Sequence, residues 1–222
     1  MQNKLIKNRK KVVIIDYQLG NLYSVKQACD ETGINAVVSS LKKDILAADA
    51  LILPGVGAFI QAMDNLKKLD IIDAIKSKVT SGTPLFGICL GLQLLFTKSE
   101  EFGSGEGLNL ISGVIKKFPE QYLEKKIKVP HITWNQLIEL NNTFKETPFK
   151  DLNHLEFMYF IHSYYVEPTN DSIILSKTNY DGIDFCSSVI QNNIFATQFH
   201  PEKSAHKGIS IYKNWAKINK LI

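Results

Sequence analysis

The pentapeptide Gly87-Ile88-Cys89-Leu90-Gly91 constrains the fold of this chain more than any other segment. The apolar stretch 83–86 precedes it and reads as a buried strand, and an apolar-rich stretch from Leu92 reads as a helix. A nucleophile between two glycines at a strand-to-helix turn is typical of a nucleophile elbow, because so tight a turn admits only small flanking residues. We expect the elbow to hold the Cys89 side chain above the sheet edge. The N-terminus of the following helix then favours the thiolate.

Cys89 also fits a second interpretation, as a small buried hydrophobe, which is the usual behaviour of a free cysteine. The cysteines at 29, 89 and 186 are odd in number and form no C-x-x-C pair, so neither a metal site nor a disulfide framework is expected, and a reducing compartment fits. For Cys29 and Cys186 we expect packing roles. One elbow cysteine with histidines far away in the sequence favours a catalytic nucleophile.

The positive charge of the chain is concentrated at its start. Residues 1–11 hold five basic side chains and no acid, while the whole chain of 222 residues carries a net charge of +4. The remainder is close to neutral, so the high isoelectric point does not indicate nucleic-acid binding. The apolar run Val12 to Ile15 is too short for a signal peptide, and no run approaches the ~18 residues of a membrane span. We expect a cytoplasmic protein without a membrane partner. We also expect a poorly ordered basic extension over 1–11 and a single domain over 12–222.

Strand and helix patterns alternate in the first half of the chain. The β-branched run 11–17 lacks polar alternation, which is typical of a strand buried on both faces. Further strands are predicted over 34–39, 50–53 and 83–86, and helices over 22–32, 41–48, 58–68 and 71–81. This alternation predicts a mostly parallel sheet flanked by helices, an α/β fold.

The second half of the chain is rich in short strands. They are predicted over 111–118, 130–140, 157–166, 173–178, 185–190 and 194–199. Residues 191–193 are a glutamine and two asparagines between the last two of these strands, which predicts a hairpin and thus a partly antiparallel region. A last helix is predicted over 203–219.

Two short segments lie where strands of the predicted sheet end. Pro54-Gly55-Val56-Gly57 follows the third strand, and its glycines let the backbone approach a ligand closely. His200-Pro201-Glu202 follows the last strand. Residues two apart in an extended chain share a side, and Pro201 pushes His200 toward extended geometry, so we expect the imidazole and the carboxylate to point together. Taken alone, the same tripeptide also fits a loop histidine beside a solvated glutamate.

The elbow, the segment Thr197-Gln198-Phe199-His200-Pro201-Glu202 and the order cysteine before histidine together resemble the class I glutamine amidotransferases. Within that class the chain resembles the family of glutaminase subunits of imidazole glycerol phosphate synthase. This narrower resemblance is carried by four segments, at 16–25, 53–59, 130–135 and 160–165. It implies the flavodoxin-like amidotransferase fold, with the central sheet and an additional antiparallel, β-rich part in the second half.

The resemblance implies a role for individual residues. Cys89 matches the nucleophile, His200 the general acid and base, and Glu202 the group that orients His200. The matches to the remaining functional positions are Leu90, Gly55 and Val56 for the oxyanion; Gly57, Gln93, Ser163 and Tyr164 for glutamine; and Asn21, Trp134 and Lys203 for the partner interface. No cofactor is implied.

The implied reaction is hydrolysis of L-glutamine to glutamate and ammonia through a Cys89 thioester. The ammonia passes to a (β/α)8-barrel cyclase subunit, bound as a heterodimer, which makes imidazole glycerol phosphate and an aminoimidazole carboxamide ribonucleotide in histidine biosynthesis. Gln18 and Thr133 depart from the family pattern, in which smaller residues are common, and both lie in segments that face the partner.

Three other interpretations stay open. Because Gln18 and Thr133 leave the identity of the partner open, the first alternative is that this chain is a related glutaminase, one that supplies ammonia for amidating a surface-polysaccharide sugar. A free-standing cysteine hydrolase of another class, or a non-catalytic interaction subunit, is disfavoured by the complete cysteine, histidine and glutamate set.

Among the other histidines, His131 and His162 are expected to be structural, and His154 and His206 to lie on the surface. Trp134 fits either core or interface.

Overall fold

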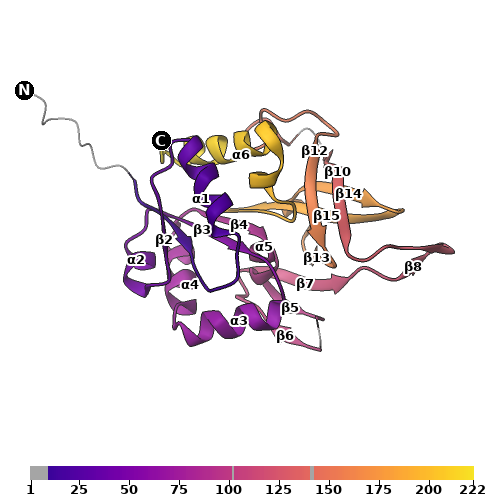
Figure 1. Cartoon of the computed structure of the whole chain (residues 1–222), viewed down its shortest axis with the longest axis horizontal. Helices are drawn as coiled ribbons and strands as arrows, with labels where there is room; N and C mark the ends of the chain where they lie inside the picture. The colour runs from indigo at the N-terminus through magenta and orange to yellow at the C-terminus, as the bar shows by residue number, and fades with distance from the viewer. Residues whose placement is uncertain (1–9, 102, 141–142) are drawn as a thin grey trace, which may run out of the picture.

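The computed structural model of the chain describes residues 10–101, 103–140 and 143–222. The parallel half of its 12-stranded sheet contains β1 (Val12–Ile15), β2 (Ala36–Ser39), β3 (Ala50–Gly55), β4 (Leu85–Cys89) and β16 (Ile194–Thr197). These strands lie in the order β2-β1-β3-β4-β16, and each neighbouring pair is parallel. The predicted parallel sheet is therefore confirmed. Figure 1 shows β4 beside β3, and β16 is the other neighbour of β4.

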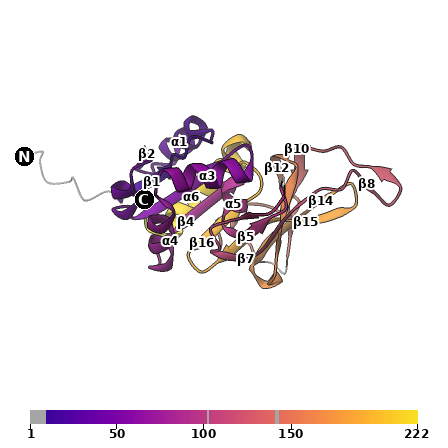
Figure 2. The same cartoon turned by 90° about the horizontal axis from the view of Figure 1, so that it is seen from below.

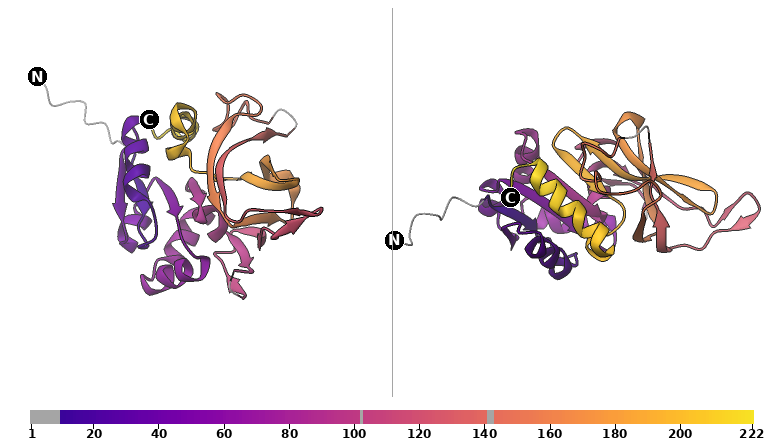
Figure 3. Two further views of the ribbon diagram at one scale, coloured as in Figure 1. Left: turned by 45° about the vertical axis from the view of Figure 1, so that its right-hand side comes forward. Right: turned by 90° about the horizontal axis from the view of Figure 1, so that it is seen from above.

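Helices cover both faces of the parallel strands. The first face carries α1 (Leu22–Glu31) and α6 (Ala205–Ile218), and the second carries α2 (Lys42–Leu46), α3 (Phe59–Lys68), α4 (Ile72–Thr80) and the short α5 (Leu90–Leu94). Along β1, Val12 and Ile14 pack toward the first face, while Val13 and Ile15 pack toward the second. Strands buried on both faces need apolar residues at every position, which is why the sequence shows no alternation here. Figure 3 shows α6 beside α1 on this first face.

The second half of the chain extends the sheet with mostly antiparallel strands, as predicted. This part contains β5 (Phe96–Ser99), β6 (Gly105–Glu106), β7 (Ile111–Lys117), β11 (Ile138–Glu139), β13 (Tyr164–Pro168), β14 (Ile174–Tyr180) and β15 (Ile183–Gln191). The hairpin predicted at 191–193 joins β15 to β16, and Asn192 takes the positive φ, +53°, of a tight turn. Figure 2 shows these strands beside the parallel ones rather than stacked on them.

Two antiparallel ribbons stand apart from the main sheet. One pairs β10 (His131–Gln136) with β12 (Phe157–His162), and the other pairs β8 (Gln121–Tyr122) with β9 (Lys125–Lys126). The single strand predicted over 157–166 is thus divided at Ser163, where the chain leaves the β10–β12 ribbon and enters the main sheet beside β7. The strand predicted over 130–140 is likewise divided, between β10 and β11.

Other predicted boundaries were wrong because tertiary pairing decided them. The third strand does not stop at Leu53: it continues to Gly55, since Pro54 and Gly55 pair with Ile88 and Cys89 of β4. The apolar stretch 92–96, expected as helix throughout, is helical only to Leu94, because Phe96 pairs with Ile111 in the sheet. Residues Pro201–Lys203 form a 3-10 turn (η2), whereas an extended chain was expected, and a second such turn, η1, spans Asp171–Ile173.

Most of the predicted basic extension, residues 1–9, lies outside the described residues. Lys10 and Lys11 are described, and their ammonium groups form ion pairs with Asp49 and Asp44. The division into this extension and a single domain stays a prediction. No helix within 10–101, 103–140 or 143–222 is long and apolar enough to cross a membrane.

Candidate active site

The elbow predicted around Cys89 is present at the carboxyl end of β4. Cys89 is the last residue of β4 and the N-cap of α5, and it has the strained backbone angles φ +55° and ψ −110°. The flanking glycines are required by packing. A Cβ on Gly91 would collide with the Leu53 carbonyl oxygen, and a Cβ on Gly87 would lie 3.0 Å from the Ala196 Cβ. The close approach of β4 and α5 to their neighbours therefore forces the Gly-x-Cys-x-Gly pattern.

The sheet register brings two chain segments to the elbow. Gly55 of β3 is paired with Cys89, and Thr197 of β16 is paired with Ile88. The strands are parallel, so their carboxyl ends meet at one edge. The segments that follow β3 and β16, which carry Gly57 and His200, therefore lie on either side of Cys89. Cys89 and His200 are more than 100 residues apart in the sequence, and they lie close together because β4 and β16 are neighbours in the sheet.

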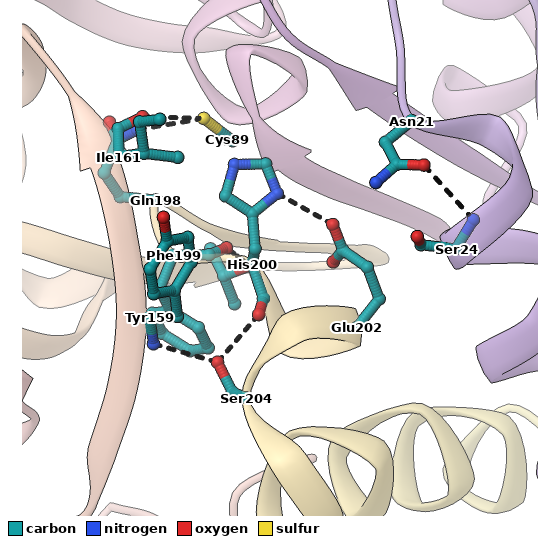
Figure 4. Close-up of polar contacts among 11 residues, drawn as sticks. Asn21, Ser24, Cys89, Tyr159, Ile161, Gln198, Phe199, His200, Glu202 and Ser204 are labelled. Atoms are coloured by element: carbon teal, nitrogen blue, oxygen red, sulfur yellow. Dashed lines mark hydrogen bonds and ion pairs between the residues drawn. The ribbon is translucent and has the colours of Figure 1, made fainter. Parts of the chain in front are cut away.

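His200 is fixed by its backbone and by Glu202. Its N–H donates to the Tyr159 carbonyl at 3.0 Å, and its own carbonyl accepts from the Ser204 hydroxyl at 2.7 Å. Its Nδ1 lies 2.7 Å from Oε1 of Glu202, with both side chains almost fully buried. Figure 4 shows the imidazole between this carboxylate and the Cys89 sulfur. The predicted alignment of His200 and Glu202 is therefore present, although the turn η2 produces it rather than an extended strand.

The electrostatics of His200 favour a protonated ring. Burial works against a charge there, but the Cys89 sulfur and the Glu202 carboxylate outweigh it and raise the pKa of His200 to about 10. In the described part of the chain, no hydrogen-bond partner reaches the buried Nε2 of His200. That nitrogen is consequently available to give or take a proton on the Cys89 side, which suits general acid and base chemistry.

The backbone around Gly55 is held by Tyr17. The Tyr17 hydroxyl donates to the Pro54 carbonyl at 2.6 Å, and a Cβ on Gly55 would collide with that hydroxyl. Gly57 has a φ of +94°, which explains the second glycine of the segment. Leu90 is the first residue of α5, so its N–H has no partner within the helix, and Leu90 lines the same cavity as Cys89. These groups can offer N–H donors to a developing oxyanion.

A cavity of about 460 Å³ opens beside the sulfur. The predicted residues that line it are Val56, Gly57, Cys89, Leu90, Gln93, Ser163, Tyr164 and His200. Gly55 and Glu202 lie behind this lining: Gly55 contacts Tyr17 and Glu202 contacts His200. The side chain of Gln93 donates to the Tyr164 carbonyl at 3.0 Å, which joins two predicted glutamine-binding residues.

Comparison with known proteins assigns the family. The model of the family "Glutamine amidotransferase class-I" matches residues 13–217. The chain belongs to the class I glutamine amidotransferases. A relative named imidazole glycerol phosphate synthase subunit HisH, from Geobacter metallireducens, is 44% identical over 92% of this chain and 97% of its own. The subunit HisH of Syntrophotalea carbinolica is 45% identical over 92% of this chain and 98% of its own.

Solved structures agree on the fold of this amidotransferase. A crystal structure described as a glutamine amidotransferase has a TM-score of 0.71 at 17% identity and covers 94% of this chain and 98% of its own. The PurLQS structure from Thermotoga maritima has a TM-score of 0.70 at 17% identity, with the same coverage. At this identity the likeness concerns the fold alone, and it confirms the predicted class I amidotransferase architecture.

Sequence reasoning missed two charged residues of this amidotransferase's cavity. Glu101 and Lys117 both line it, and Glu101 is buried while it accepts the Phe59 N–H at 2.6 Å. Burial raises the pKa of Glu101 above its ordinary value. Glu101 follows β5 and Lys117 ends β7, two strands that are not adjacent to β4. Nothing in the sequence but their charge marked them: Glu101 lies in a predicted loop, and Lys117 lies near the end of the strand predicted over 111–118.

The two structural histidines of this amidotransferase form a buried pair. His131 Nδ1 lies 3.0 Å from His162 Nε2, across the β10–β12 ribbon. Burial lowers the pKa of His131 to about 4. Burial, together with the nearby His131 and His200, lowers the pKa of His162 to about 3. Both rings are therefore neutral at physiological pH. His162 also lines the cavity, which sequence reasoning had not assigned to it.

The three predicted interface residues lie outside the cavity. Trp134 is 46% exposed on β10, Lys203 is exposed in η2, and the half-buried Asn21 caps α1 by accepting the Ser24 N–H at 3.3 Å. On the ribbon, Trp134 lies opposite Tyr159, and the exposed Ile132 lies opposite the exposed Ile161. This apolar face, which we call the ribbon face, reaches the cavity because Ile161 also lines it.

Proposed function

We propose that this chain is the glutaminase subunit of an imidazole glycerol phosphate synthase. The observation that carries the proposal is the arrangement of Cys89, His200 and Glu202 at one cavity, since this is the nucleophile, base and orienting group of a thioester mechanism. The cavity also presents an acidic Glu101 and a basic Lys117. Opposite charges beside a nucleophile suit an α-amino acid, whose ammonium and carboxylate groups they would hold.

The proposed reaction begins when the Cys89 thiolate attacks the side-chain amide carbon of glutamine. The N–H groups of Leu90 and of the Gly55-Val56 segment hold the oxyanion. His200 gives its proton to the leaving nitrogen as the C–N bond breaks, so that ammonia departs and the Cys89 thioester remains. His200 then takes a proton from water as the water attacks the thioester carbon, and the C–S bond breaks to release glutamate and restore the Cys89 thiolate. Glu202 keeps His200 oriented through Nδ1. Gly57, Gln93, Ser163 and Tyr164 hold the substrate.

The proposed partner is a (β/α)8-barrel cyclase subunit that takes up the ammonia. Two relatives at 44% and 45% identity carry the name of a synthase subunit, which supports a two-subunit assembly. The exposed ribbon face beside the cavity also supports a partner here, because apolar side chains grouped on a surface mark interaction sites. Asn21, Trp134 and Lys203 are the proposed contact residues.

Steady-state glutamine hydrolysis tests this proposal. We expect the isolated chain to hydrolyse glutamine slowly, and the cyclase with its nucleotide ligand to raise kcat much more than it lowers KM. The reason is the Val56-Gly57 backbone beyond the end of β3, where a glycine permits the chain to rotate. An oxyanion N–H that is turned away costs about 10²–10³-fold in rate. Cys89→Ala is expected to abolish hydrolysis while the complex still forms product from added ammonia.

The outcomes separate the alternatives. Hydrolysis by Cys89→Ala at the rate of the unmodified chain would show that Cys89 is not the nucleophile. Full activity of the isolated chain would favour a free-standing glutaminase. Activation by a sugar-amidating partner but not by the cyclase would favour the polysaccharide pathway. Gln18 and Thr133, which differ from the family pattern, are the reason for testing that pathway.

A further inference from the structure

A chain of side-chain amides links the cavity wall to the Cys89 sulfur. Gln93 Nε2 lies 3.0 Å from the Tyr164 carbonyl oxygen and 3.1 Å from Gln198 Oε1. Gln198 Nε2 in turn lies 3.7 Å from the Cys89 sulfur. Gln198 is fully buried, and its backbone N–H donates to the Ser187 carbonyl at 2.9 Å. Figure 4 shows Gln198 beside the sulfur, on the side away from Glu202.

The direction of these hydrogen bonds is fixed by the Tyr164 carbonyl. A backbone carbonyl can only accept, so the Gln93 amide must turn its NH₂ group toward Tyr164. The second hydrogen of that NH₂ group then faces Gln198, which must present its oxygen. The remaining end of the Gln198 amide, its NH₂ group, consequently faces the Cys89 sulfur. An oxygen in that place would instead repel a thiolate.

We propose that Gln198 positions the Cys89 sulfur and stabilises its anionic form by donating an N–H to it. The proposal rests on the proposed function, in which Cys89 is the nucleophile. Hydrogen bonds to a charged acceptor are stronger than neutral ones, and they gain from a buried setting without competing water. Among the described residues, the sulfur is the acceptor that the Gln198 NH₂ group reaches. A buried amide without that partner would leave a donor unsatisfied.

The proposal assigns two separate tasks around the sulfur. His200 lies on one side and exchanges protons, whereas Gln198 lies on the other and holds no proton that it can give up. Both Gln93 hydrogens are engaged by Tyr164 and Gln198, so Gln93 has only its oxygen left for the substrate. The amide chain therefore couples the substrate wall of the cavity to the orientation of the nucleophile.

Alkylation of Cys89 by iodoacetamide tests the proposal without requiring glutaminase activity. The reagent reacts with thiolates. Burial raises the pKa of both Cys29 and Cys186 to about 12, so these cysteines give little background. The Cys89→Ala protein measures the background alkylation of these two cysteines. Gln198→Met keeps the length of the side chain but removes the donor. We expect alkylation at neutral pH to slow about tenfold, the effect of one hydrogen bond to a charged group.

Steady-state kinetics with the cyclase complex give a second readout. We expect Gln198→Met to lower kcat by a similar factor of about ten and to leave KM within about twofold, because the substrate contacts are kept. Thr197→Val is the matched control: Thr197 is also buried, and its hydroxyl donates to the Phe199 carbonyl at 3.1 Å, not to the sulfur. We expect this control to retain the alkylation rate.

An unchanged alkylation rate in folded Gln198→Met overturns the proposal. Should that variant not fold, Gln93→Met provides the test from a different element, α5. It removes the donor that orients the Gln198 amide, so we expect alkylation to slow about threefold, and an unchanged rate again overturns the proposal. If Gln198→Met slows alkylation as expected but the unmodified complex does not hydrolyse glutamine, the proposed function is contradicted and the role of Gln198 is not. The two failures are therefore distinguishable.

Discussion

At the scale of residues, the His200 and Glu202 pair combines burial with charge. Their side chains are only 2% and 1% exposed, and separating such a pair leaves a charge buried without its partner. The second carboxylate oxygen of Glu202 and the Tyr212 hydroxyl are both buried and lack a hydrogen-bond partner within the described ranges. Burial raises the pKa of Tyr212 well above its ordinary value, and the nearby Glu202 charge adds to this. Glu202 therefore hydrogen-bonds His200 through one carboxylate oxygen, Oε1.

This geometry predicts unequal effects of two substitutions on glutamine hydrolysis. His200→Asn removes the group that transfers the proton, so we expect kcat to fall about 10²–10⁴-fold. Glu202→Gln keeps the imidazole and loses only its charged orienting partner, so we expect a smaller fall. Steady-state kinetics of the cyclase complex provide the measurement. A greater loss for Glu202→Gln than for His200→Asn would reverse the assigned roles.

At the scale of elements, the elbow depends on how closely α5 approaches β3. The Cα of Gly91 lies where a side chain would enter the Leu53 carbonyl oxygen, which belongs to β3. The same approach places the first turn of α5 next to the segment after β3, and so brings Leu90 and Val56 to one cavity. The helix is only five residues long, which means that its position is set by packing rather than by its own stability.

We therefore predict a large stability loss for Gly91→Ala. The added methyl group must displace β3 or α5, and we expect the free energy of unfolding to fall by more than about 4 kcal/mol, or the protein not to fold. Gly20→Ala is the matched control, because an added Cβ there meets nothing nearer than 3.4 Å. Urea unfolding of both variants checks the expectation. A stable Gly91→Ala protein would mean that α5 can move away from β3 without cost.

At the scale of the whole molecule, the buried histidine pair makes stability depend on pH. The folded state lowers the pKa of His131 to about 4 and that of His162 to about 3, below the value of 6.5 for an unperturbed histidine. Below pH 6.5 the unfolded chain therefore binds protons that the folded chain does not. By linkage, the contribution of this pair to stability is present in full above this pH and is lost as the pH falls toward 3.

The pair predicts a steeper acid-side loss of stability than surface histidines give. We expect His131→Gln to reduce the slope of unfolding free energy against pH, between pH 6 and 5, by up to about 1.4 kcal/mol per pH unit. His206→Gln, on an exposed residue, serves as the control and should leave the slope unchanged. Urea unfolding across this pH range provides the data. Equal slopes for both variants would show that His131 is protonated in the folded protein.

Much of the fold and of the candidate site followed from local sequence. Gly87-Ile88-Cys89-Leu90-Gly91 and His200-Pro201-Glu202 each span only a few residues, so local sequence was enough to mark them as candidates. Their catalytic roles came from the resemblance to the amidotransferase family, which combines the two segments. The apolar run at 12–15 and the helical patterns after it predicted the parallel sheet, because strands buried on both faces have a distinctive composition. These features are short-range, and they survive any arrangement of the rest of the chain.

Only the tertiary structure decided which distant residues share the cavity. Glu101 lines the cavity, and Gln198 contacts the Cys89 sulfur. Neither was assigned a role from the sequence, since a charged residue or an amide near a strand end has many uses. Their places follow from strand order: β16 lies beside β4, and β5 lies farther along the sheet beyond β7. The division at Ser163 has the same origin, because two different sheets compete for one apolar run. Pairing between strands distant in sequence is set by the packing of the whole core, which local periodicity does not encode.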